Sequence, residues 1–560
     1  MRVSLVLLSM FLMFVFSTSQ LVLELETHVD PQEFATQHGL VLKKHLFNSI
    51  YEFTSQNEET HTRSISERFE SLEGVKWAEE QVPQKRYKRE HKRMVDDPLY
   101  DAQWHLDVIE AKTSYTGGKE SSSSSSGVGG GKGIIIGMVD DGLQHTHPEL
   151  VDRYVANHSW NFNDGNQRDP SPRDPGDGHG TAAAAVAVGT KLNGHCGRGV
   201  AWGASVAGLR LIAQPVTGVT EAEALSFHSD YIRIYSNSWG PADTGRGMDA
   251  PSRVVREALA YYAGVKNRIY VWASGNGRDN TDSCSFDGYA GNPYVNAIGA
   301  IDYDGNQAWY SEGCANLMAV APSSGSFGMG KSITTADLLG SAGYDPGECT
   351  HSFGGTSSAA PLASGIIALL LEKNPLLSWR DVKHVIALGA TRINPEHESW
   401  HVNQRGYHHS NVFGFGLLKV PSLFKVLENY RLLSDSSNQS QIQKQIFSPT
   451  IRPTKSETSS FLINMTNTNI TFIENAILRI ALTHPRRGDV VIRLISPEGT
   501  VSVLAERRND PNPNYPSEGW SFSSLHFWGE TKANGLWEVQ VDDNTSRLQI
   551  QWLMIGIFGY

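Results

Sequence analysis

The feature that most constrains the fold is a series of short, continuous apolar runs separated by helix-like stretches. The runs are GIIIGMVDDG from residue 133, VAGLRLI from 206, YIRIYSNSW from 231 and IYVWASGN from 269. A run without polar alternation is typical of a strand buried on both faces of a parallel sheet. Helix-like segments such as residues 250–265 and 356–374 lie between or after the runs. This alternation predicts a doubly wound α/β domain, in which ligands bind at the carboxyl ends of the strands.

The sequence on either side of this region predicts two further domains. Residues 20–89 have their own alternating apolar pattern and form a small α/β unit, which ends in the basic stretch KRYKREHKRM. That stretch reads as an exposed linker or as a processing site. From about residue 440 short strands alternate with turn residues and no good helix appears, which predicts an all-β sandwich over 440–560. The α/β domain then covers 90–435, with a flexible Ser/Gly-rich insert at 121–133.

The first residues predict entry into the secretory pathway. An arginine at position 2 is followed by an apolar run over residues 3–16 and by the small residues Ser17 and Ser19, so we expect a signal peptide, 1–19, cleaved after Ser19. No later segment reaches 18 apolar residues, so we expect no membrane anchor and a location in the secretory lumen (Golgi or secretory vesicles) or outside the cell. Five glycosylation sequons fit a lumenal protein, at Asn157, Asn438, Asn464, Asn469 and Asn544.

The cysteines and the charge limit the other partners. The chain has four cysteines. An even number in an oxidising compartment suggests two disulfides, and the residues alone leave three pairings open. No cysteine–histidine spacing suggests zinc. The net charge of −11 argues against a nucleic-acid partner and is compatible with a basic ligand, although ordinary solubility explains it as well.

Four short motifs together carry a chemistry that none of them carries alone. Asp140 ends a buried run in VDDG, His179 lies in GHGT, Ser357 lies in GGTSSAAP, and Asn276 lies in ASGNG. Each motif by itself is a turn or a helix start. A serine nucleophile needs a base within hydrogen-bond reach and an acid that orients the base. An Asn amide near them can donate to an oxyanion, which is worth ~3–4 kcal/mol in subtilisin.

With these motifs the chain resembles the kexin/furin-type proprotein convertases, a branch of the subtilisin-like serine proteases. The resemblance runs from about residue 30 to residue 560. It rests on VDDG, HGT, YSNSWGP, VWASGNG, DSCSFDGY, WYSEGC, GTSSAAPLASGIIAL and the RRGD at 486–489. It implies that Asp140, His179 and Ser357 form a catalytic triad, with Asn276 as the oxyanion donor. The C-terminal part is similar to the family's P (homo B) domain. Its RRGD reads either as an integrin-binding motif or as a turn between strands.

The resemblance also implies a cleft that reads basic residues through carboxylates. Asp287 matches the acid for the arginine before the scissile bond, with Asp243 beside it. Asp141 matches the acid for the second basic residue; a further acid of that pocket, just before the catalytic His, appears here as Gly176, with Asp177 adjacent to it in the sequence. The remaining positions match the fourth pocket and the substrate-pairing strand: Glu221, Asp249, Tyr289, Ser238, Trp239, Gly240 and Trp272. The chain departs from the pattern where further acids are usual, at Gly176, Ala213, Pro215, Gly218 and Ala242, so we expect weaker use of more distant basic residues.

Calcium and the disulfide pairing are implied in the same way. Asp243, Asp282 and Glu312 match a calcium site behind the first pocket. A second calcium site matches the side chains of Asp97, Glu149 and Asn193 with the carbonyls of Thr190, His195 and Gly197; Glu149 stands where the family usually has Asp. The implied disulfides are Cys196–Cys349 and Cys284–Cys314. A further family cysteine after the His motif is replaced by Ala183.

The resemblance therefore implies a calcium-dependent serine endopeptidase that cleaves precursor proteins after Lys-Arg or Arg-Arg. Its prodomain, 20–89, is expected to act as chaperone and inhibitor and to be cut by the enzyme itself after Arg89, with Lys92-Arg93 as the second choice. We expect a monomer. One alternative is a broad-specificity secreted subtilisin-like protease, against which the cleft acids argue. Another is a catalytically silent binding protein acting through its β-sandwich, against which the intact triad argues.

Overall fold

The computed structural model describes ten stretches of the chain. They are residues 20–55, 65–81, 87–88, 100–114, 130–164, 167–325, 331–433, 443–447, 458–543 and 547–560. The expected signal peptide, Arg89, Lys92-Arg93, Asp97, most of the Ser/Gly-rich insert and the sequons at Asn438 and Asn544 lie outside these stretches.

The centre of the α/β domain is a seven-stranded sheet with the order β13-β12-β11-β9-β6-β8-β7, in which every neighbouring pair is parallel. The strands are β6 (Ile135–Asp140), β7 (Trp160–Asn161), β8 (Ser205–Arg210), β9 (Ile234–Asn237), β11 (Ile269–Ala273), β12 (Val295–Ile301) and β13 (Leu317–Pro322). Strands β9, β11, β12 and β13 are buried along their whole length, as their unbroken apolar character predicts.

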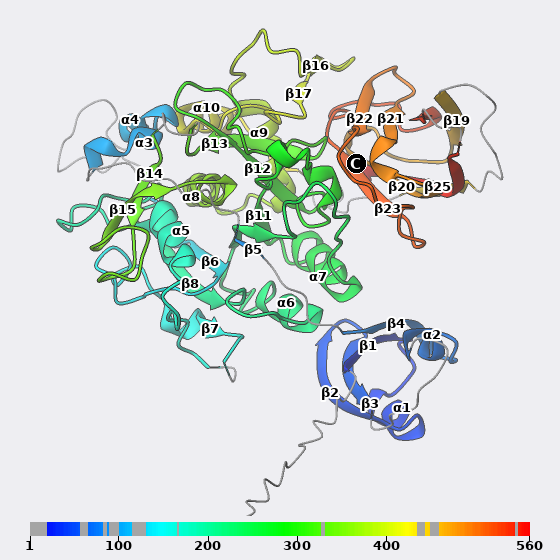
Figure 1. Cartoon of the computed structure of the whole chain (residues 1–560), viewed down its shortest axis with the longest axis horizontal. Coiled ribbons are helices and arrows are strands. Elements are labelled where there is room, and N and C mark those ends of the chain that lie inside the picture. The colour runs from blue at the N-terminus through cyan, green and yellow to red at the C-terminus, as the bar shows by residue number, and fades with distance from the viewer. Residues whose placement is uncertain are drawn as a thin grey trace, which may run out of the picture. The chain divides into compact units, whose positions relative to one another are not determined.

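Helices and short hairpins surround this sheet (Figure 1). Helices α5 and α8 pack against each other and against strands of the sheet. The helices are α3 (Trp104–Val108), α4 (Ala111–Ser114), α5 (His179–Val188), α6 (Gly218–Ala224), α7 (Arg253–Gly264), α8 (Thr356–Lys373), α9 (Trp379–Gly389) and α10 (Val420–Leu427). The additional strands are β5 (Tyr87–Lys88), β10 (Trp239–Gly240), β14 (Ile333–Ala336), β15 (Cys349–Phe353), β16 (Trp400–Val402) and β17 (His408–Ser410).

The N-terminal unit has an antiparallel sheet of its own, with the order β2-β3-β1-β4. Its core includes Leu21, Leu23, Phe34 and Phe53. Asp30 caps the first helix by accepting hydrogen bonds from the backbone N–H groups of residues 32 and 33. The elements are β1 (Gln20–Leu25), α1 (Pro31–Gln37), β2 (Leu40–Phe47), β3 (Ile50–Ser55), α2 (Ile65–Glu70) and β4 (Val75–Glu80).

The C-terminal region is a sandwich of two antiparallel four-stranded sheets, β18-β25-β20-β23 and β19-β24-β21-β22. The strands are β18 (Gln443–Phe447), β19 (Thr458–Met465), β20 (Ile473–Thr483), β21 (Val491–Ile495), β22 (Val501–Ala505), β23 (Trp520–Ser524), β24 (Gly535–Asp542) and β25 (Gln549–Gly559). Alternate side chains of β19 and β24 are buried, which is the pattern of a sandwich strand. Phe286 and Ala315 of the α/β domain belong to the same apolar core.

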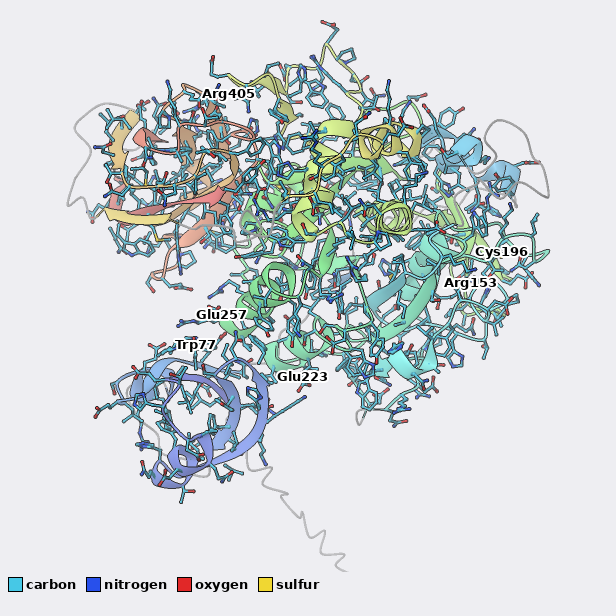
Figure 2. The ribbon with its side chains drawn as sticks, turned by 180° about the vertical axis from the view of Figure 1, so that it is seen from behind. Trp77, Arg153, Cys196, Glu223, Glu257 and Arg405 are labelled. Carbon is cyan, nitrogen blue, oxygen red and sulfur yellow. A yellow bond between two sulfur atoms is a disulfide. The ribbon has the colours of Figure 1, made fainter. Side chains whose placement is uncertain are left out.

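A buried ionic group also joins the sandwich to the α/β domain. Glu474 at the start of β20 accepts two hydrogen bonds from Arg380 Nε and one from its Nη2, at 2.8–3.1 Å, and lies 2.6 Å from His384 Nε2. Burial raises the pKa of Glu474, but the hydrogen bond from His384 and the charge of Arg380 outweigh it, so the pKa lies below the ordinary glutamate value. A second interdomain pair, Arg405–Glu498, lies nearer the surface, where Figure 2 labels Arg405.

The predicted fold class is confirmed: the α/β domain is a doubly wound parallel sheet and the C-terminal region is a β-sandwich. Asn157, Asn464 and Asn469, the sequon residues within the described stretches, are exposed. Of the helices that the structure describes, none combines the length and the apolar character that a bilayer crossing needs.

Replacing Glu474 with Gln is expected to lower the free energy of unfolding at pH 7 by about 3 kcal/mol, because it leaves the buried Arg380 without an anionic partner. Denaturant unfolding measures the change. The control Arg405→Gln removes an ion pair whose arginine is 39% exposed, so its loss should stay below about 1 kcal/mol.

The stability difference between the wild type and Glu474→Gln should also depend on pH. Because the folded pKa of Glu474 is depressed, its contribution is present above the unfolded glutamate pKa of about 4.3 and is lost as the pH falls through the lower folded value. The stability difference between wild type and Glu474→Gln should therefore shrink in acid. An equal difference at pH 7 and pH 3 would contradict this assignment.

Candidate active site

The side chains of Asp140 and His179 meet at the carboxyl end of strand β6. His179 Nδ1 lies 2.8 Å from Asp140 Oδ1 and 3.0 Å from Oδ2. Both side chains are almost fully buried. A carboxylate at this position favours the imidazole tautomer that carries its proton on Nδ1, which leaves Nε2 able to accept a proton. The pair therefore has the geometry of an oriented general base.

This contact depends on a close approach of helix α5 to the end of β6. A Cβ atom on Gly180 would lie 2.3 Å from the carbonyl oxygen of Gly142 and 2.7 Å from the Cβ of Asp140, so only glycine fits there. The carboxylate of Asp141 accepts hydrogen bonds from the N–H groups of His179 (3.3 Å) and Gly180 (2.8 Å). Asp141 is thus buried as a cap of the helix that presents His179.

Ser357 is the second residue of helix α8. Gly355 before the helix has a φ of 71°, a conformation that glycine adopts without strain, and its carbonyl accepts a hydrogen bond from the Ser323 hydroxyl at 2.6 Å. The Ser357 hydroxyl donates to the carbonyl of Ser238 at 3.3 Å, and the Ser238 hydroxyl donates to the carbonyl of Ser357 at 3.0 Å. A serine at a helix N-terminus lies where the helix dipole stabilises negative charge.

Asn276 is fixed beside this helix start. Its Oδ1 accepts hydrogen bonds from the backbone N–H of Thr356 (2.8 Å) and from the Thr356 hydroxyl (3.0 Å). With Oδ1 held in this way, the amide NH₂ group faces away from Thr356 and is available as a donor. Thr356 was not among the residues predicted for the site, although it stands next to Ser357 in the GTSS motif.

Asp287 has a rigid, nearly buried carboxylate. Its Oδ1 accepts hydrogen bonds from the N–H groups of Tyr289 (2.7 Å) and Ala290 (3.3 Å), and the residue is 6% exposed. The backbones of Asp249 and Asp287 form an isolated parallel bridge. The structure therefore brings together two of the acids predicted for the substrate cleft.

Glu221 and Tyr289, predicted for the fourth pocket, are hydrogen-bonded at 2.6 Å through the phenol and Oε2. Tyr289 stacks on Trp272, with ring centroids 4.9 Å apart, and meets Trp239 edge-on at 5.3 Å. The Trp239 indole in turn donates to the carbonyl of Val139, next to Asp140. This aromatic cluster connects the predicted cleft residues to the end of β6.

Asp177 is held by an arginine that the sequence reasoning missed. Arg210 at the end of β8 is fully buried, and its Nη2 donates to Asp177 Oδ2 at 3.0 Å while its Nη1 donates to Asp164 at 2.7 Å. The sequence does contain a signal for this contact, because Arg210 is a charged residue inside the apolar run VAGLRLI and a buried charge needs a partner. Asp141 and Asp177 both have partners within the protein, and their proposed role toward a second basic residue stays a prediction.

The segment Tyr87–Lys88 forms an antiparallel ladder with β10, with Tyr87 opposite Gly240 and Lys88 opposite Trp239. The main chain of residues 239–240 therefore pairs with an extended segment of this chain, and its pairing with a substrate strand stays a prediction. The two paired residues directly precede Arg89 in the sequence.

Three predicted calcium ligands surround one glycine. A Cβ atom on Gly277 would lie 2.7 Å from the Cβ of Asp282, 3.0 Å from that of Asp243 and 3.0 Å from Glu312 Oε1. The carboxylates already accept hydrogen bonds from main-chain N–H groups, as Glu312 does from Gly277 at 2.9 Å. Burial raises the pKa of Asp282. The three acids approach one point and one of them is desolvated, which suits a divalent cation, but their ligand oxygens do not all lie within 4.8 Å of one another among the described residues, so calcium binding there stays a prediction.

The second predicted calcium site contains a buried carboxylate, that of Glu149. Glu149 is 1% exposed, and its Oε2 has no hydrogen-bond partner among the described residues. Burial raises its pKa to about 7. Its Oε1 accepts from the N–H of Gly197 at 3.3 Å, and its backbone carbonyl accepts from Thr190. Asn193 and His195 lie in the same loop, joined by a hydrogen bond at 3.1 Å. The donor set fits calcium.

Both implied disulfides are present. Cys196–Cys349 and Cys284–Cys314 are bonded, and no free cysteine remains. The first bridge connects the Glu149-side loop to β15, which leads into helix α8. The second connects the segment before Asp287 to the residue that follows Glu312 by two positions.

Comparisons with known proteins place this geometry in a family. The model of the subtilase family (peptidase S8) matches residues 131–416, and the model of the proprotein convertase P-domain matches residues 473–553. The chain is 34% identical to proprotein convertase subtilisin/kexin type 5 of Rattus norvegicus over 85% of its own length and 27% of that protein. It is 33% identical to furin of Homo sapiens over 91% of its length and 64% of that protein.

A solved structure shows the same fold. The serine protease of Aeromonas sobria matches 84% of this chain and 98% of its own with a TM-score of 0.71 and 22% identity. The chain spans about a quarter to just under two thirds of the length of the convertases that it matches. With a subtilase domain followed by a P-domain, the chain belongs to the subtilase family, in its kexin/furin-type proprotein-convertase branch.

Proposed function

We propose that the protein is a calcium-dependent serine endopeptidase that processes precursor proteins after paired basic residues. The observation that carries the proposal is the Asp140–His179 hydrogen bond at 2.8 Å, made from helix α5, which packs against helix α8, the helix whose start holds Ser357 and anchors Asn276. The convertase relatives and their P-domain support precursor processing in the secretory pathway.

In the proposed mechanism the Ser357 hydroxyl oxygen attacks the carbonyl carbon of the arginine that precedes the scissile bond. His179 Nε2 takes the hydroxyl proton and later gives it to the leaving amine, while Asp140 keeps the imidazole oriented and stabilises its cation. The amide of Asn276 and the backbone N–H of Ser357 donate to the oxyanion. Water then attacks the acyl-enzyme by the same steps, with His179 again transferring the proton.

The specificity is assigned to fixed carboxylates. Asp287, with Asp243 beside it, takes the arginine before the scissile bond, and the buried Glu221–Tyr289 pair favours arginine at the fourth position. Calcium held by the Asp243, Asp282 and Glu312 group, and by the Glu149 site, would neutralise these acids and stabilise their loops. These fixed acids do not support the alternative function, a broad-specificity subtilisin-like protease.

The chain's own prodomain is proposed as the first substrate and as an inhibitor. The ladder between Tyr87–Lys88 and β10 supports a bound propeptide strand that leads to Arg89. The motif Arg86-Tyr-Lys-Arg89 carries basic residues at the positions that the proposed pockets read.

Ser357→Ala is expected to block self-processing, because the nucleophile is lost. N-terminal sequencing of the secreted protein should start at Gln20 in this variant and at Glu90 in the wild type. The control Ser358→Ala removes the neighbouring hydroxyl and should still start at Glu90. A Ser357→Ala chain that begins at Glu90 would show that another protease makes the cut, and a wild-type start at Met94 would move the site to Arg93.

Reversing the charge at Asp287 tests the specificity. Asp287→Lys is expected to reduce kcat/KM for Lys-Arg peptides by at least about 100-fold, because an arginine would meet a like charge in a nearly buried pocket. The measurement is a peptide panel with Lys-Arg, Ala-Arg and Ala-Phe bonds. Asp304→Lys makes the same change at an exposed position and should leave the panel unaltered. Equal wild-type cleavage of Ala-Phe and Lys-Arg would favour the broad-specificity alternative.

Thermal unfolding, rather than activity, tests whether the protein binds calcium. A chelator should lower the melting temperature of the wild type, and added calcium should restore it. Glu149→Gln is expected to shift the calcium concentration needed for this recovery upward by about tenfold, because it removes a charged ligand. Asp152→Asn, an exposed acid three residues away, is the control. A melting temperature that does not respond to the chelator would contradict the calcium sites.

A further inference from the structure

Two segments of the α/β domain that carry the proposed first-pocket acids lie next to each other. Residues 243–249 hold Asp243, and residues 281–287 hold Asp287. At one end Asp282 Oδ2 accepts from the N–H of Gly245 at 2.7 Å. At the other end the N–H of Asp249 donates to the carbonyl of Phe286 (3.3 Å) and the N–H of Gly288 to that of Asp249 (3.0 Å). The pocket shape thus depends on the spacing of these two segments.

A single arginine of the P-domain contacts both segments. Arg508 Nη2 donates to the carbonyl of Gly247 at 2.6 Å, and its Nη1 donates to Asp282 Oδ1 at 3.4 Å. Its guanidinium carbon lies 3.6 Å from the ring centroid of Phe286, the residue before Asp287. The side chain is only 2% exposed. A planar guanidinium presents five N–H donors in a fixed fork and can reach separate acceptors on both segments, whereas the three donors of a lysine share one nitrogen.

The RRGD turn of the P-domain holds this arginine in place. Asp510 is fully buried and accepts from Arg508 Nη2 (2.6 Å) and from Arg487 Nε (2.7 Å), while Arg487 Nη2 donates to the carbonyl of Arg246 at 2.7 Å. A Cβ atom on Gly488 would lie 2.4 Å from the carbonyl oxygen of Arg508. The motif is therefore a packed turn at an interdomain contact and not an exposed integrin ligand.

A third contact acts on the residue before Asp282. Thr281 has a φ of 60°, which is unfavourable for a β-branched residue. Its hydroxyl oxygen accepts a hydrogen bond from the backbone N–H of Asn509 in the P-domain at 2.8 Å. This contact helps to hold a backbone conformation that the local sequence would not favour, at the start of the second segment.

We propose that Arg508 is a positioning residue for the first specificity pocket, through which the P-domain sets the distance between the Asp243 and Asp287 segments. The proposal rests on the proposed function, since it assigns the arginine preference to those two acids. Without the clamp the two segments can separate, so a substrate arginine loses the paired carboxylates while the Ser357–His179 chemistry keeps its own supports.

The test compares kcat/KM for two peptides that differ only in having Arg or Lys before the scissile bond, at saturating calcium. The ratio of the two values is independent of the fraction of active enzyme, so partial misfolding does not change it. Arg508→Gln should lower the Arg/Lys ratio about tenfold, mainly through a higher KM for the Arg peptide. Arg508→Lys keeps the charge but not the bridge, so it should lower the ratio as well.

Two further variants separate a clamp from general destabilisation: Arg405→Gln is a control, and Thr281→Val weakens the same interdomain contact at another residue. Arg405→Gln removes an interdomain ion pair on a different segment and should keep the wild-type ratio. Thr281→Val removes only the acceptor for Asn509 and should lower the ratio by a smaller factor. An unchanged ratio in active Arg508→Gln, or full recovery in Arg508→Lys, overturns the clamp. If neither Arg508 variant is secreted, an unchanged ratio in Thr281→Val overturns it. A wild type without any preference for arginine would instead refute the proposed function.

Discussion

The hydrogen bond between His179 and Asp140 depends on how closely helix α5 approaches the end of strand β6. Glycine at position 180 permits the approach, and the Asp141 carboxylate fastens the first turn of the helix to the strand end. Asp140 ends strand β6, which lies inside a parallel sheet, and Asp141 directly follows it. The orientation of the imidazole is thus a property of backbone packing, and the rest of the site is arranged around it.

Much of this arrangement could be predicted from the sequence. The unbroken apolar runs required strands buried on both faces, and parallel strands bring their carboxyl ends to one edge of the sheet. That places Asp140 and Asn276 at the same edge without further information. The disulfide pairing, by contrast, remained open among three possibilities until the resemblance to the convertases was used.

The missed contacts join residues that are far apart in the chain. Arg508 and Asp282 are separated by 226 residues, and Arg380 and Glu474 by 94. An isolated arginine in a turn or on a helix usually lies at the surface. Its burial depends on how two domains pack, which no local pattern encodes. The two hydrogen bonds that Asp141 accepts from the start of helix α5 were missed for the same reason. The sequence showed the charge of Asp141 but not its position next to that helix end.

The apolar core of the P-domain includes Phe286 and Ala315 from the α/β domain. Trp520 of β23 adds a hydrogen bond from its indole to the carbonyl of Ser285 at 2.9 Å. Strand β25 pairs with both β18 and β20 of the same sheet, so this core closes only when β25 is in place. During synthesis, therefore, Phe286 and Ala315 can join this core only after more than 200 further residues have been added to the chain. The segment just before Asp287 thus gains its full apolar surroundings only once strand β25 has been made.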